Sequence, residues 1–67
     1  MDKKIKISFQ NYYMGDTLGS LASNGFKVSG FDDLNQCFTG IIPEENLEKA
    51  KTDLEKDTNK TSTIIEL

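Results

Sequence analysis

The adjacent carboxylates and the single thiol, which are the residues whose type and spacing could indicate catalysis or metal binding, lie between residues 32 and 37. Asp32 and Asp33 are adjacent carboxylates, and Cys37 is the single thiol of the chain. Paired carboxylates can serve acid–base catalysis or calcium binding, but neighbouring side chains in an extended chain point in opposite directions. The composition of residues 32–35 is typical of a turn. We therefore interpret the pair as part of a turn, and we expect Cys37 to be a small buried residue.

The residue types that are absent exclude further chemistry. The sequence contains no His, no Arg and no Trp. His is the usual general base and a common zinc ligand, and one Cys without His cannot form a structural zinc site. Arg is the residue that binds phosphate and carboxylate groups through two hydrogen bonds at once. We therefore expect no catalytic residue, no metal site and no bound cofactor.

Charge and apolar content restrict the partners and the compartment. The net charge is −3, with +2 in residues 1–31 and −5 in residues 32–67. Nucleic-acid affinity depends on phosphate contacts, so this charge and the lack of Arg argue against a nucleic-acid partner. No apolar run reaches the roughly 18 residues of a membrane-spanning helix, and no apolar signal-peptide core follows Met1. Together with the single cysteine, these features predict a cytoplasmic protein.

The length limits the number of domains and the size of the core. The chain has 67 residues, which predicts a single domain over residues 1–67. A core of this size supplies no more than roughly 3–5 kcal/mol of stability. Self-association would add to that stability, so a homodimer is one of the assemblies we consider.

Two elements are expected in the first half of the chain. Residues 4–10 alternate between apolar and polar side chains, which predicts a half-buried strand. Asp16 suits the N-cap of a short helix over residues 17–23, and Gly25 suits the position after its end. The alternation of residues 26–29 predicts a second strand that extends toward Phe31.

Three further elements are expected in the second half. Residues 37–42 form a third strand, which pairs with the second as a hairpin. Pro43 and the acidic residues that follow it suit the start of a helix over residues 44–57. Residues 61–67 are rich in β-branched side chains and predict a last strand.

The order strand, helix, strand, strand, helix, strand is that of the ferredoxin-like βαββαβ fold, of class α+β. Right-handed crossovers would place both helices on one face of a four-stranded antiparallel sheet. An alternative interpretation takes residues 12–25 as an irregular loop, which leaves a sheet of three or four strands with a single helix in the C-terminal half.

In element order and size the chain resembles heavy-metal-associated domains. These domains carry a Cys-x-x-Cys pair after the first strand, whereas residues 10–16 contain no cysteine here. The resemblance therefore extends to the fold and implies no metal-binding function.

Two surfaces are candidates for interaction with another protein. The first is the loop Tyr12-Tyr13-Met14, because aromatic residues and Met are enriched at interfaces; these side chains could instead cap the core. The second is the sheet face away from the helices, which would form an apolar patch. A more twisted sheet or a different register would hide this patch. Its expected members are Phe31, Phe38 or Ile42, and Ile64.

These features favour a small non-catalytic protein–protein interaction module. A chain of this size and composition suits a bacterial or phage accessory factor, such as an inhibitor or adaptor that docks on a larger protein. The alternative is a regulatory domain that senses a small ligand and dimerises through its sheet. The alternative predicts a pocket at a dimer interface, whereas an adaptor predicts an exposed apolar surface.

Overall fold

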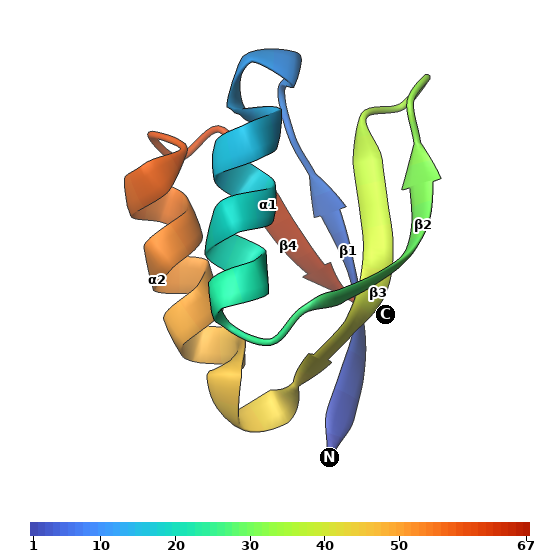
Figure 1. Ribbon diagram of the computed structural model, residues 1–67, viewed down its shortest axis with the longest axis vertical. Helices are drawn as coiled ribbons and strands as arrows, with labels where there is room; N and C mark the ends of the chain where they lie inside the picture. Colours follow the sequence, from blue (N-terminus) through green and yellow to red (C-terminus); the bar gives the residue numbers. More distant parts are fainter.

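The elements follow one another in the expected order. A computed structural model describes all residues from 1 to 67 and is drawn in Figure 1. The elements are β1 (Asp2–Ser8), the 3-10 turn η1 (Asn11–Tyr13), α1 (Met14–Ser23), β2 (Lys27–Asp32), β3 (Cys37–Pro43), the 3-10 turn η2 (Glu44–Asn46), α2 (Leu47–Asp57) and β4 (Thr63–Glu66).

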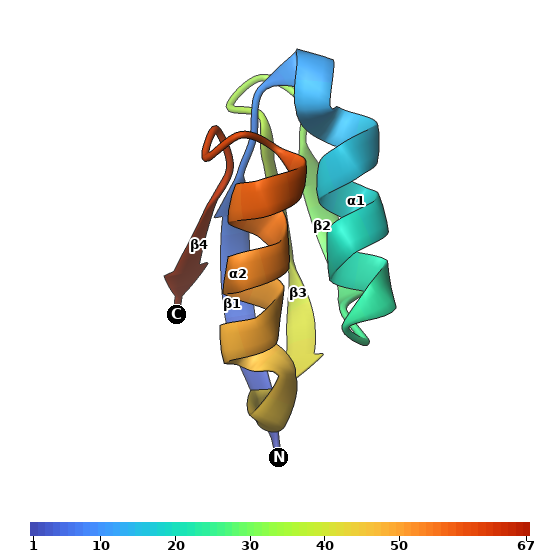
Figure 2. The same ribbon diagram turned by 90° about the vertical axis from the view of Figure 1, so that its left-hand side faces the viewer.

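The four strands form one antiparallel sheet in the order β2-β3-β1-β4. Both helices pack against the same face of this sheet (Figures 1 and 2). The predicted ferredoxin-like βαββαβ fold is confirmed, and the alternative with a single helix is wrong because residues 14–23 form α1. Neither helix combines the length and apolar character needed to span a bilayer.

β1 is a central strand, and its alternation separates the two faces of the sheet. Ile5 and Ile7 are fully buried on the helix side, whereas Lys4 and Lys6 lie on the face that no helix covers, called here the open face. Residue by residue, β1 pairs with β3 on one side and with β4 on the other. The period of two in the sequence therefore matches the burial of the strand.

α1 begins earlier than the sequence predicts. We expected Asp16 to be the N-cap, but the helix starts at Met14, and Asp16 lies in its first turn without capping it. A carboxylate there still interacts favourably with the helix dipole. The predicted end is confirmed, because Gly25 has a φ of +84° and its N–H bonds to the carbonyl of Ala22.

A β-bulge interrupts β2 and decides the direction of Phe31. Val28 pairs with Gly40 and Gly30 pairs with Thr39, so one extra residue, Ser29, is inserted between them. An inserted residue reverses the alternation of the side chains that follow it. Phe31 therefore faces Phe38 on the helix side of the sheet, and the expected open-face position of Phe31 is wrong.

α2 covers the sheet with a narrow apolar stripe. Leu47, Ala50 and Leu54 are buried against the sheet, as their spacing predicts. The helix ends at Asp57, the predicted residue, while residues 44–46 form the turn η2 instead of the first helical turn. The core that results contains Ile5, Ile7, Phe9, Leu21, Phe26, Phe38, Ile42, Leu47, Ala50 and Leu54.

Candidate functional site

The apolar patch predicted on the open face is absent. Phe38 and Ile42 belong to the buried core, and Ile64 packs against that core from β4. The physical reason is the register of β3, in which Phe38 is opposite Ile7 and shares its face. Phe38 and Ile42 do lie on the same face of β3, but that face is the one that packs against the helices and not the open face.

The open face carries lysines in place of the expected aromatic side chains. Lys4 and Lys6 project from the central strand β1, opposite Ile41 and Thr39 of β3. Lys27 joins the same face from β2, where it pairs with Ile41. Asp32 and Ile65 lie on this face as well, opposite Cys37 and Lys6, so the face is mixed in character. The lysines of its central strand disfavour stacking against the same face of a second copy.

The segment Tyr12-Tyr13-Met14 is divided between solvent and core. Met14 is partly buried and packs against the core, which agrees with the interpretation that part of this segment caps it. Tyr12 is 86% exposed, although its ring meets that of Tyr13 edge-to-face with centroids 4.9 Å apart. Tyr12 thus presents a large side chain to solvent from a short, well-defined turn.

The β2–β3 hairpin brings two more apolar side chains to the same end of the molecule. Leu34, at the hairpin turn, is 91% exposed, and Phe31 is 51% exposed. Both views place the hairpin turn and η1 at one end, the upper end as drawn (Figures 1 and 2). We call the surface formed by Tyr12, Tyr13, Phe31 and Leu34 the apical surface.

A stack of three phenylalanine rings supports the apical surface from below. The ring of Phe38 lies 4.6 Å from that of Phe9 and 5.1 Å from that of Phe31, measured between centroids. Phe9 and Phe38 are buried, so Phe31 rests on rings that the core holds in place. The exposed part of Phe31 is therefore positioned by the fold.

The turn at the hairpin is held by Asp32. Its carboxylate accepts hydrogen bonds from the backbone N–H of Asn35 (3.1 Å) and from the side-chain amide of Asn35 (2.7 Å). The side-chain hydrogen bond, followed by the backbone one, holds the pKa of Asp32 below its ordinary value. The interpretation of Asp32-Asp33 as part of a turn is confirmed for Asp33, whereas Asp32 is the last residue of β2 and accepts the hydrogen bonds that hold the turn.

Cys37 follows this turn and is buried. Its thiol donates a hydrogen bond to the carbonyl of Asn35, with 3.2 Å between sulfur and oxygen. The expectation of a small buried residue is confirmed. No group of three or more Cys, Asp or Glu side chains is arranged to hold a metal ion.

Polar side chains join the two helices in a way that the sequence analysis missed. Thr17 and Ser20 of α1 and Asn24, which caps the end of that helix, are buried and recur at intervals of three and four, which places them on one side of the helix. Ser20 donates a hydrogen bond to Asp57 at the end of α2. We call this set of contacts the helix seam.

Two further hydrogen bonds belong to the helix seam, one from α1 to the segment that precedes β4 and one from the end of α1 to α2. Thr17 and Ser62 share a hydrogen bond of 2.8 Å between their hydroxyl oxygens. The amide of Asn24 donates to Asp53 over 3.1 Å. The pKa of Asp53 is held below its ordinary value mainly by a hydrogen bond from Lys49, with Asn24 second. Every buried side-chain polar atom has a partner, so the seam explains helix packing and leaves no free group for chemistry.

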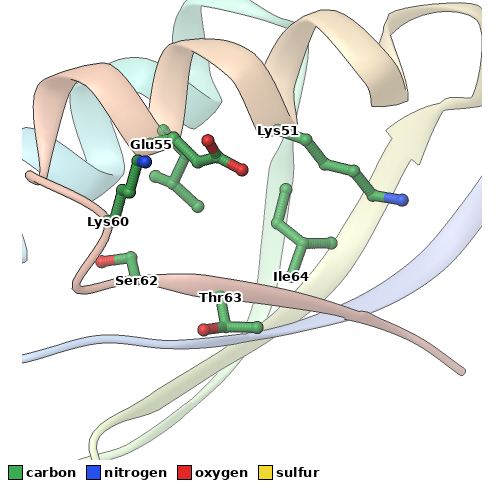
Figure 3. A pocket seen from close by; sticks show the side chains of 7 residues that line it. Lys51, Glu55, Lys60, Ser62, Thr63 and Ile64 are labelled. Atoms are coloured by element: carbon green, nitrogen blue, oxygen red, sulfur yellow. The ribbon is translucent and has the colours of Figure 1, made fainter.

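A small pocket lies between α2 and β4 (Figure 3). Its volume is about 250 Å³, which is below the range of about 300–1,000 Å³ that is usual for ligand sites. The amine of Lys51 lies 3.3 Å from Glu66 in an ion pair, so that charge is already matched. The lining residues are Lys51, Leu54, Glu55, Lys60, Ser62, Thr63 and Ile64.

Sequence comparisons do not extend this description. The chain matches no protein-family model and no curated protein. The geometry therefore carries the functional argument, and its most distinctive feature is the apical surface.

Proposed function

We propose that the protein is a small non-catalytic interaction module that docks on a larger protein through the apical surface. The observation that carries this proposal is the gathering of Tyr12, Phe31 and Leu34, all large and exposed, at one end of the molecule. An exposed tyrosine and an exposed leucine occupy short turns, although small polar residues would form these turns equally well.

The apical residues suit the centre of an interface. Aromatic side chains that insert into pockets contribute a large share of binding energy in protein complexes. A tyrosine offers a large contact area, and it has only two side-chain torsions to fix on binding. Burying a leucine such as Leu34 contributes about 1.5–3 kcal/mol. Since Phe31 rests on buried rings, it loses little freedom when a partner covers it.

The charges around the apical surface indicate the chemistry of the partner. Asp32 and Asp33 precede Leu34 in the hairpin, and Asp16 lies in the first turn of α1 at the same end of the molecule. A partner with an apolar pocket and a basic rim would complement this arrangement. We therefore place the protein in the role of an inhibitor or adaptor, acting in the cytoplasm on a larger protein.

The ligand-sensing alternative has less support. It needs a dimer that stacks its open faces around a pocket, but Lys4 and Lys6 occupy the middle of that face. A hollow of about 310 Å³ does border the open face, but only two of its six lining residues are apolar, whereas ligand sites are lined mainly by apolar side chains. The pocket of about 250 Å³ lies between α2 and β4, on the helix side of one molecule. A ligand-sensing dimer would therefore need a surface other than the open face, because the apolar patch expected there is absent.

The proposal is tested by removing the apical side chains without touching the core. Wild type, the double variant Tyr12→Ser/Leu34→Ser and the control Leu67→Ser are each used to capture partners from cell extract. Leu67 is exposed and lies at the chain terminus, on the β4 edge. A captured protein is then purified and titrated calorimetrically against all three.

We expect the double variant to bind at least about tenfold more weakly than wild type, since loss of two hot-spot side chains costs a few kcal/mol. The Leu67→Ser control should retain wild-type affinity. A partner that binds all three proteins equally would rule out the apical surface as the docking site.

A further inference from the structure

The outer edge of β2 has no partner strand. β2 is the first strand in the sheet order, so its outward N–H and C=O groups are free to pair with another strand. Val28 is 50% exposed and Phe31 is 51% exposed, although both point to the helix side. In Figure 1, β2 lies at the side of the sheet farthest from both helices, which explains this exposure.

The opposite edge of the sheet is protected. β4 is short, and its Glu66 is held by Lys51 at 3.3 Å and by Lys3 at 3.5 Å. Ion pairs along an edge strand discourage pairing with other chains. β2 has no such ion pair, so the two edges differ in their readiness to accept a strand.

The side chains of β2 are arranged symmetrically about its bulge. Val28 and Phe31, on either side of the bulge, both face the helix side because they pair with Gly40 and Phe38. Lys27 and Asp32, one position further out, both face the open side because they pair with Ile41 and Cys37. Along β2, the bulge is therefore flanked on each side by an apolar residue and then by a charged one. The two charged residues, Lys27 and Asp32, are opposite in sign.

We infer that β2 pairs in antiparallel fashion with β2 of a second copy of this chain, about a twofold axis through the bulge. In this arrangement Lys27 of each copy lies opposite Asp32 of the other, and Val28 of each copy lies opposite Phe31 of the other. Each pair occurs twice, and both members of each pair lie on the same face of the joined sheet.

The self-complementarity identifies the occupant of the edge as a second copy. In an antiparallel pair, the first and last residues of the two strands are opposed, so a strand with unlike terminal charges complements itself. The bulge is needed for this match, because without it Val28 and Phe31 would face opposite sides of the sheet. The buried apolar pairs would also add to a core that is small for an isolated chain.

The dimer has a defined shape. A twofold axis perpendicular to the sheet joins the two sheets into one of eight strands, with all four helices on one face. Because paired strands run in opposite directions, the two apical surfaces lie at opposite ends of the dimer. The inference stands apart from the proposed docking function, since Tyr12 and Leu34 remain exposed in the dimer; Phe31 is the one residue common to both surfaces.

A charge exchange tests the pairing. Lys27→Asp places two like-charged pairs across the axis, and Asp32→Lys does the same with opposite sign. Light scattering coupled to size-exclusion chromatography gives the mass of each protein over a concentration series, and Lys60→Asp is the control. We expect wild type and the control to dimerise, and each β2 variant to raise the dimer dissociation constant at least about tenfold.

Mixing the two β2 variants is the decisive step. In the mixed dimer every charge pair is again opposite in sign, so we expect the dimer to return. A wild-type monomer at every concentration overturns the inference and leaves the bulge as a device that protects the edge. Variants that dimerise as well as wild type, or folded variants whose mixture stays monomeric, also overturn it.

A second measurement covers the case in which Asp32→Lys unfolds the hairpin turn. Ser29→Cys in a Cys37→Ser background places one thiol beside the axis, and a short bis-maleimide should cross-link two chains. The matched variant Leu34→Cys, at the hairpin turn, should not cross-link. Absence of a cross-link at Ser29, or equal cross-linking at both positions, overturns the inference. Capture experiments with the Lys27→Asp monomer test the docking proposal separately, because its apical surface is unchanged.

Discussion

The ring of Phe26 lies directly against the backbone of Gly40. A Cβ atom at Gly40 would lie 2.8 Å from two carbons of this ring and 2.1 Å from the backbone oxygen of Lys27. The ring is buried in the core, and the oxygen belongs to the strand that pairs with Gly40, so neither can move freely. A glycine is therefore required here, because the close approach leaves no space for a side chain.

We expect Gly40→Ala to lower the free energy of unfolding by about 1–3 kcal/mol, the usual cost of forcing an extra carbon into a packed interior. Urea denaturation followed by circular dichroism measures this loss. A Gly40→Ala variant as stable as wild type would show that β2 can shift away from β3 at little cost, contrary to the contact described.

Gly19 provides a matched substitution with the opposite expected sign. A Cβ at Gly19 would have no atom within 4 Å, and the residue lies in the interior of α1. Alanine has a higher helix propensity than glycine by up to about 1 kcal/mol. We therefore expect Gly19→Ala to raise the free energy of unfolding by about that amount in the same urea experiment. A loss of stability would contradict the open space that the structure shows around Gly19.

The hydrogen bond between Thr17 and Ser62 provides a test of the helix seam. Thr17→Val keeps the shape of the side chain but leaves the buried hydroxyl of Ser62 without a partner, which costs about 1–3 kcal/mol. Ser62→Ala should have a similar cost. The double variant removes both hydroxyls, so its loss of stability should be smaller than the sum of the two single losses. Strictly additive losses in urea denaturation would show that the two hydroxyls do not depend on each other.

The alternation of β1 and the stripe of α2 were the clearest signals of the fold in the sequence. Ile5 and Ile7 alternate with lysines, and Leu47, Ala50 and Leu54 recur at helical spacing, so the periods of two and of 3.6 were both visible. These signals are local, since each depends on residues within a single element. The element order then restricted the topology to one common fold.

The candidate surface depended on information that these local patterns do not contain. Phe31 faces the helix side because Ser29 is an extra residue, and a bulge has no reliable sequence signal apart from a nearby glycine such as Gly30. β3 is apolar on both faces, so its pattern could not show which face meets the helices. The exposure of Leu34 could have been predicted, because an apolar residue within a turn composition has no core to reach.

Glu66 connects β4 to both β1 and α2 through charge. The hydrogen bond from Lys51, then the charge of Lys51, and then Lys3 hold the pKa of Glu66 below its ordinary value of 4.5. A depressed pKa means that the folded protein binds a proton at Glu66 more weakly than the unfolded chain does. The stabilising contribution is therefore complete above the pKa of the unfolded chain and is lost as the pH falls through the folded pKa.

We expect the free energy of unfolding of wild type to decrease as the pH falls below 4.5, the ordinary pKa of Glu66. Glu66→Gln keeps a hydrogen-bond acceptor but has no proton to gain, so its stability should decrease less over the same interval. Asp32 and Asp53, whose pKa values are also lowered, remain in both proteins and contribute equally to the two profiles. Urea denaturation over a pH series measures the difference, and added salt should reduce it because exposed ion pairs are screened. Parallel profiles for the two proteins would show that Lys51 and Lys3 do not hold Glu66 in solution. The outer edge of β4 would then lack the ion pairs that protect it from pairing with another strand.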